Sequence, residues 1–146
     1  MNETPAYIIK SYLVGEGLLT DPADSGDWPV YTGVLPDSPE VVDDIVACMD
    51  TSGVKDGRSM KTGVTLFHQG VQILLRSEDY NDGYAKVQTL ADALAEIQNV
   101  EEVISGTTYE INNVTQTTDV IVLSQEEGSK RRGFFSVNFL VTITVL

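Results

Sequence analysis

The strict alternation near the end of the sequence constrains this chain more than any other feature. From Phe134 to Leu146, large apolar side chains alternate with mostly polar ones over about twelve residues, which is the period of a β-strand. One face carries Phe135, Val137, Phe139, Val141, Ile143 and Val145. The other face carries Phe134, Ser136, Asn138, Leu140, Thr142 and Thr144. A strand with one continuous apolar face predicts a sheet that is covered on that side.

A second regular pattern predicts a helix over residues 79–97. Ser77 or Asp79 can cap its start, and the helix dipole favours the negative charges of Asp79 and Asp82 there. A shorter helix is predicted after Thr4, a capping residue, and Pro5, which suits the first helical turn, with Gly15 near its end. The apolar residues that recur every three or four positions in the longer helix are Tyr80, Tyr84, Val87, Leu90, Ala91, Leu94 and Ile97.

The rest of the chain is predicted to be strands and loops. The predicted strands are residues 30–35, 41–49, 71–77, 107–115 and 120–123. Asp50 to Gln69 has no steady period and contains several glycines, so it is predicted to be a surface loop of about 20 residues. The order of helix, strands, helix and strands predicts an α+β fold. We expect one domain over residues 1–146, a mixed or antiparallel sheet and two main helices packed on one face.

The charge balance limits the partners of the chain. Nine Lys and Arg residues stand against 22 Asp and Glu, a formal net charge of -13. Such a surface does not favour free nucleic acid or an acidic membrane, because both need clustered cations. The sequence also shows no apolar run of roughly 18–20 residues and no signal-peptide pattern. We therefore expect a protein that is made and stays in a cytoplasm, or that leaves it without a secretion signal.

The residues suited to catalysis or metal binding are few and scattered. Cys48 is the one cysteine and His68 the one histidine. We expect a buried structural thiol and a solvated loop histidine, with a Cys48–His68 nucleophilic pair as a remote alternative. Asp50, Asp79 and Asp82 are expected to be caps and surface groups rather than a cation site. The sequence therefore predicts no catalytic residues, no cofactor and no bound metal.

Two groups of cations stand out in this acidic chain. One lies in the predicted 50–69 loop and the other at residues 130–132, where it is either a hairpin tip that keeps the chain soluble or a contact with an acidic partner. We expect these cations and one aromatic side chain of the loop to form an interface. The predicted interface residues are Lys55, Arg58, Lys61, Phe67, Lys130, Arg131 and Arg132.

Two segments carry a resemblance to a known family. Residues 70–84 read GVQILLRSEDYNDGY and residues 134–143 read FFSVNFLVTI. At this separation the pair resembles the tail-terminator or tail-completion proteins of long-tailed bacteriophages, which are often called minor capsid proteins. The shared features are an early strand bounded by prolines, an R-S-x-D-Y-like turn after a strand, a helix with an aromatic start and an F-S-V-N-F-like run. Here they are Pro29 to Pro36, Arg76 to Tyr80, the helix carrying Tyr84, and Phe135 to Phe139.

The resemblance implies a structural virion protein that is not an enzyme. It implies a homo-hexameric ring on the last ring of the tail tube, which stops tube growth and joins the tail to the head connector. The tail tube protein and a neck protein would be its partners, and DNA would pass through the ring without specific binding. The location would be the tail-neck region of the virion, after assembly in the host cytoplasm.

Two other functions remain open at this point. One is a different neck protein, such as a head-closure or connector component, which would bind on the portal side instead of the tube end. The other is a small ligand-binding α+β domain, which would show an apolar pocket with converging polar groups and no ring. The negative net charge has two equally good explanations. It would keep DNA from adhering to the inner wall of a ring, or it simply makes the protein soluble.

Overall fold

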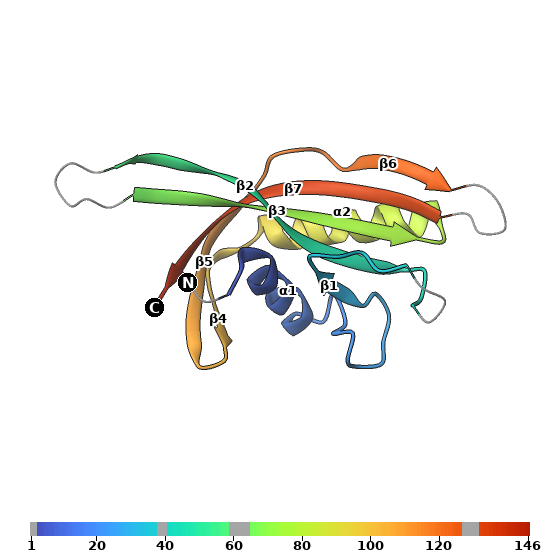
Figure 1. Cartoon of the computed structure of the whole chain (residues 1–146), viewed down its shortest axis with the longest axis horizontal. Coiled ribbons are helices and arrows are strands. Elements are labelled where there is room, and N and C mark those ends of the chain that lie inside the picture. Colours follow the sequence, from blue (N-terminus) through green and yellow to red (C-terminus); the bar gives the residue numbers. More distant parts are fainter. Residues whose placement is uncertain (1–2, 38–40, 59–64, 127–131) are drawn as a thin grey trace.

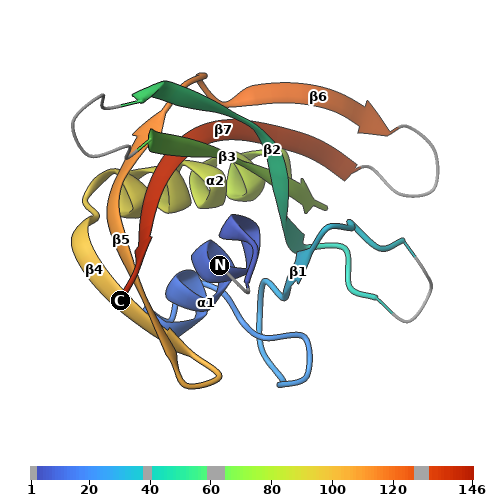
Figure 2. The same ribbon diagram turned by 60° about the vertical axis from the view of Figure 1, so that its left-hand side comes forward.

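The computed structural model describes residues 3–37, 41–58, 65–126 and 132–146, and in them one curled, seven-stranded sheet surrounds two helices (Figures 1 and 2). The elements in chain order are α1 (Pro5–Gly15), β1 (Val30–Thr32), β2 (Ile45–Arg58), β3 (Thr65–Ser77), α2 (Tyr80–Ala95), β4 (Gln98–Ile104), β5 (Thr107–Gln116), β6 (Ile121–Glu126) and β7 (Arg132–Val145). The fold is therefore α+β with a mixed sheet, as the sequence predicts.

The last strand, β7, occupies the middle of the sheet. The strand order is β1-β2-β3-β7-β5-β4, and β6 also pairs with β7. On one side β7 pairs with β3, and on the other it pairs first with β6 and then with β5. Thus Phe135 lies between Leu75 and Val122. Only the β1–β2 pair is parallel among the pairings described, which makes the sheet mixed.

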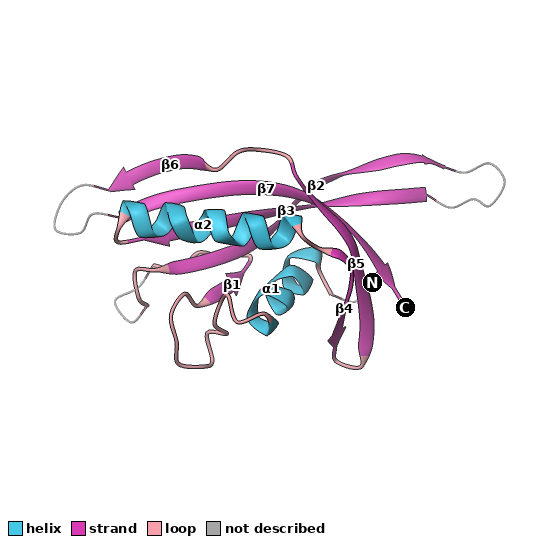
Figure 3. Ribbon diagram, turned by 180° about the vertical axis from the view of Figure 1, so that it is seen from behind, coloured by secondary structure: helices cyan, strands magenta, loops and turns pink. Residues whose placement is uncertain are grey.

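The predicted alternation along β7 is confirmed for most of its length. Phe135, Val137, Phe139 and Val141 are fully buried, whereas Val145 at the end of the strand is exposed. Both helices lie within the curl of the sheet (Figures 2 and 3). The core therefore consists of buried side chains from the helices and from the inner face of the sheet. Its largest helical members are Ile8, Ile9 and Leu13 of α1 and Leu90 and Leu94 of α2.

The two helices begin where their capping residues predict. The Thr4 hydroxyl accepts a hydrogen bond from the Tyr7 amide, and the Asp79 carboxylate accepts one from the Asp82 amide at 2.9 Å. Tyr80 and Tyr84 differ from the rest of the predicted helix face, because they are 44% and 43% exposed. Their ring centroids lie 5.4 and 6.2 Å from that of Phe135.

The prediction of a long loop from Asp50 to Gln69 is wrong for every residue of it that the structure describes. Residues 50–58 continue β2 and residues 65–69 begin β3, and the two paired segments extend past the neighbouring strands (Figures 1 and 3). We call these two segments the arm. The register shifts twice, between Thr51 and Val54 and between Lys55 and Arg58. Such bulges interrupt the alternation of two, so the sequence looks aperiodic although the backbone is extended.

The two early strands are also shifted from their predicted positions. β1 ends at Thr32 instead of residue 35, and β2 begins at Ile45 instead of residue 41. The residues between them bind side chains of other elements, as described below. None of the helices of the described chain is both long and apolar enough to span a membrane.

Candidate functional site

The predicted interface cations fall on two parts of the fold. Lys55 and Arg58 belong to β2 of the arm, and Phe67 belongs to β3 beside them. Lys61, Lys130 and Arg131 lie outside the described residues. Arg132 begins β7, and its side chain is described in full. Of the predicted interface residues that the structure describes, Lys55, Arg58 and Phe67 thus lie on the arm and Arg132 lies at the first residue of the central strand.

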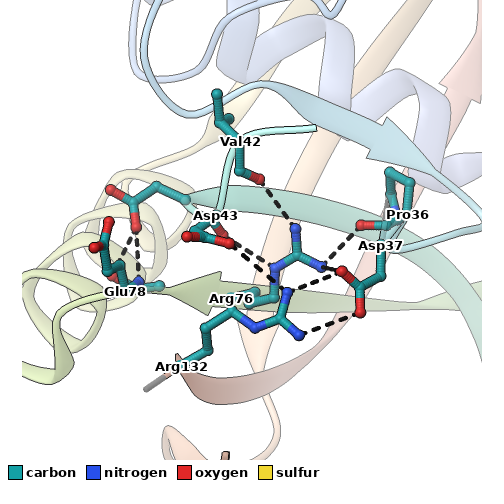
Figure 4. Close-up of polar contacts among 9 residues, drawn as sticks. Pro36, Asp37, Val42, Asp43, Arg76, Glu78 and Arg132 are labelled. Carbon is teal, nitrogen blue, oxygen red and sulfur yellow. Dashed lines mark hydrogen bonds and ion pairs between the residues drawn. The ribbon is translucent and has the colours of Figure 1, made fainter. Parts of the chain in front are cut away.

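Arg132 is held in an ion-pair cluster at the start of β7 (Figure 4). Its two terminal nitrogens lie 2.9 and 3.2 Å from the two carboxylate oxygens of Asp37, a bidentate pair. A carboxylate oxygen of Asp43 lies 3.7 Å from the same guanidinium. Because the residue is only 8% exposed, Arg132 presents little of its charge to a partner in this conformation.

Arg76, at the end of β3, forms the buried part of the same cluster (Figure 4). Its guanidinium donates to the backbone carbonyls of Pro36, Val42 and Asp43 at 2.9, 3.0 and 3.1 Å. One terminal nitrogen also lies 3.5 Å from Asp37. These contacts fasten the connection between β1 and β2 onto the sheet, and they satisfy a cation that is 1% exposed.

A second polar group fixes the turn between β3 and α2. The Asp44 carboxylate accepts from the Ser77 hydroxyl at 3.1 Å and from the Glu78 amide at 2.9 Å. The Ser77 hydroxyl also lies 2.8 Å from the Asp79 carbonyl. The residues between β1 and β2 therefore hold both the end of β3 and the beginning of α2.

The Arg76 cluster is what reasoning from the sequence missed. Arg76 was part of the quoted R-S-x-D-Y-like turn, but nothing in its neighbourhood indicated a buried role. Its carbonyl partners lie 33 to 40 positions earlier in the chain. The one available signal was an arginine at the end of an otherwise apolar strand, residues 71–77.

Cys48 and His68 do not come together. Cys48 on β2 pairs with Ile73 on β3. His68 lies on β3 five residues before Ile73, so the backbones of Cys48 and His68 are separated by roughly 16 Å along the strand. Burial raises the pKa of the Cys48 thiol to about 12, with a smaller opposing effect of Lys10, so the thiol is a poor nucleophile. His68 is half-buried, with its Nδ1 atom 2.8 Å from the Thr142 hydroxyl oxygen.

Of Asp50, Asp79 and Asp82, two have carboxylates that accept hydrogen bonds from backbone amides. Asp50 accepts the Ala6 amide of α1 at 2.9 Å, and Asp79 accepts the Asp82 amide at the start of α2. Across the described ranges, no group of three or more His, Cys, Asp or Glu side chains is placed to hold a metal ion.

An open cleft of about 620 Å³ lies between the start of α2 and the loop before β1. Lys86 lines the cleft, and its ammonium donates to the Leu18 carbonyl at 2.5 Å and lies 5.9 Å from the centre of the Trp28 ring. Burial lowers the pKa of the Lys86 ammonium, and the charge of Asp27 opposes that shift. The acidic residues that line the cleft are Asp27, Asp43, Asp44, Glu78 and Asp82. This acidic lining would repel anionic ligands.

Comparison with known proteins gives one informative result. The sequence model of the family described as "Bacteriophage tail terminator protein" matches residues 12–145. Among curated proteins, none matches the sequence. Several solved structures match, and one of them aligns over 97% of each chain with a TM-score of 0.45 and 10% identity. A likeness this weak bears on neither fold nor function.

Proposed function

Because this chain belongs to the bacteriophage tail terminator family, we propose that it forms a ring on the head-proximal end of the tail tube, ends tube polymerisation and joins the tail to the head connector. The family is one of structural phage tail proteins, so a tail role does not depend on the details of the ring. The observation that carries the proposal is the family match, which covers residues 12–145 and with them all seven strands and α2.

The ring is proposed to contain about six copies of the chain, the number that the family resemblance implies, and such copies would be related by closed cyclic symmetry. The tube protein would contact one side of the ring and a neck protein the other. The arm supports this arrangement because it extends past the neighbouring strands, so it could contact another subunit at a distance from the core (Figure 1). The interface residues predicted from the sequence remain part of the proposal, with Lys55, Arg58 and Phe67 on the arm.

The net charge of -13 suits a ring through which DNA passes. Like charges on the ring wall would keep the phosphate backbone from adhering to it. The proposed role needs no chemical step, so we expect no enzymatic activity and no cofactor.

The direct test is negative-stain electron microscopy of tail tubes polymerised with and without the purified protein. We expect one additional ring at one end of each tube and no further growth at that end when more tube protein is added. In tails taken from virions, the ring should lie at the end nearest the head. A ring at the tail tip, a repeating position along the tube, or binding only to the portal side would contradict the proposal.

A further inference from the structure

We propose that β6 is the edge at which one copy of the chain pairs with the next copy. This inference rests on the ring proposed above and names its subunit contact. Among the strands that the structure describes, β6 pairs with β7 alone, so its other edge presents free backbone amides and carbonyls. In Figures 1 and 2 it runs along the outer margin of the sheet, on the far side of β7 from α1.

The side chains of β6 are unusually apolar for a free edge. Ile121, Val122 and Leu123 follow one another in sequence and are 44%, 42% and 54% exposed. Free edges of natural sheets are normally protected by lysines, prolines or inward-pointing charges. Residues 120–125 contain no lysine, no proline and no charge, and the one irregularity is a register shift between Val122 and Ser124. This strip therefore has the properties of an edge that another strand covers.

The opposite margin of the same sheet offers a matching edge. β1 pairs with β2 only from Val46 to Cys48, so from Met49 onward the outer edge of β2 has no strand beside it in the described chain. Val54 on this part of β2 is also 53% exposed. A chain with one open edge on each margin of its sheet can pair head to tail with identical copies. Repeated contacts of this kind close into a ring when the rotation allows it.

The charges favour a second copy as the occupant. Each copy carries a net charge of -13, so contact between copies is least opposed where the surface is neutral, as it is along residues 120–125. The outer edge of β2 is neutral overall as well, because Lys55 and Arg58 balance Asp50 and Asp56 within residues 49–58. Two neutral edges can therefore meet between copies that elsewhere repel each other.

A charge placed on β6 tests the contact. We expect Leu123→Lys to raise the protein concentration needed for half-maximal tube capping by at least about tenfold. The matched control is Val145→Lys, which replaces an equally exposed apolar residue with the same charge on a strand whose ladder is already paired with Tyr109. Urea unfolding of both variants should give the wild-type midpoint. Capping by Leu123→Lys at the wild-type concentration would overturn the inference and leave the proposed function standing.

A cross-linking experiment identifies the occupant and does not depend on the lysine variant folding. Because Cys48 is buried and unreactive, Leu123→Cys introduces the one accessible thiol of the described chain. A photoactivatable maleimide attached there should link two copies in capped tubes, with the second attachment within residues 49–58. Links to the tube protein alone, links to another part of a second copy, or no links in visibly capped tubes would overturn the inference. Failure of the wild-type protein to cap tubes would overturn both proposals.

Discussion

The guanidinium of Arg132 donates a hydrogen bond to each carboxylate oxygen of Asp37, although the two residues are 95 positions apart in the chain. The Asp37 side chain is 61% exposed, so this pair by itself contributes only about 0–1 kcal/mol. The pair lies next to Arg76, one terminal nitrogen of which is 3.5 Å from Asp37. The buried guanidinium of Arg76 donates to three backbone carbonyls of the β1–β2 connection. The stabilising part of the cluster is therefore the inner arginine.

Replacing Arg76 tests that division of roles. Arg76→Leu should lower the free energy of unfolding by roughly 2–5 kcal/mol, because carbonyls of the β1–β2 connection lose their charged donor. Asp37→Asn should change it by less than about 1 kcal/mol, since that carboxylate faces solvent. Urea unfolding of both variants measures the difference. Equal losses would show that the outer pair contributes as much as the inner contacts.

Gly83 in the first turns of α2 should not tolerate a larger residue. A glycine in a helix normally costs about 1 kcal/mol relative to alanine, so Gly83→Ala would be stabilising on propensity alone. Here the added methyl group would lie 2.6 Å from the Ser77 Cβ atom and 2.7 Å from the Phe135 ring. We expect a net loss of roughly 1–2 kcal/mol in thermal or urea unfolding, because overpacking outweighs propensity. An increase in stability would mean that Phe135 relaxes freely.

Leu94 tests the buried face of α2. The residue is 1% exposed, and Leu94→Ala should lower the free energy of unfolding by roughly 2–5 kcal/mol through lost burial and a residual cavity. The control is Asp92→Ala on the exposed side of the same helix, with an expected change within about 0.5 kcal/mol. A loss below about 0.5 kcal/mol for Leu94→Ala would place the core on another face.

Cys48 should report on unfolding and on alkaline pH. Its thiol should resist alkylation at neutral pH in the folded protein and react fully in guanidinium chloride, because burial raises its pKa from 9.0 to about 12. The folded state keeps the proton that the unfolded state releases, so the contribution to stability is complete below pH 9 and is lost as the pH rises towards about 12. Cys48→Ala should remove this part of the alkaline loss. Rapid labelling of the native protein would contradict the burial.

Removing the arm separates assembly from folding. We expect a variant in which an Asn-Gly turn joins Gly53 to His68, in place of Val54 to Phe67, to fold, because every described core residue lies outside the deleted stretch. The same variant should fail to cap tubes, and tails assembled with it should overgrow. Circular dichroism checks the fold and electron microscopy the tail length. Tails of normal length would show that the arm has no part in termination.

The elements that the sequence predicted well are those with uninterrupted local periodicity. Helix α2 and strand β7 were placed within a few residues because their side chains repeat at 3.6 and 2 positions against a single core. The arm was missed because two register shifts and its glycines break that repeat. Local periodicity therefore predicted the central helix and strand correctly but predicted a loop where the arm lies.

The Arg76 cluster could not be predicted, because it depends on contacts that are distant in sequence. Pro36 and Val42 bind Arg76 only after the β1–β2 connection lies across the end of β3. For the same reason Arg132 looked like a free surface cation in the sequence, whereas its carboxylate partner is Asp37. The cations of the arm, by contrast, stood out in the sequence only because they are positive charges in an acidic chain, and their role in assembly stays a prediction.

The central place of β7 has a consequence for how the chain folds. It pairs with β3, β5 and β6, yet it follows all three of them in the chain. Until residues 132–145 leave the ribosome, β3 lacks its neighbour on one side and the two halves of the sheet have nothing to join them. Contacts of such long sequence separation form slowly because a large loop must close first. The sheet is therefore completed only after translation has passed residues 132–145, and a nascent chain that stops before β7 cannot complete the fold.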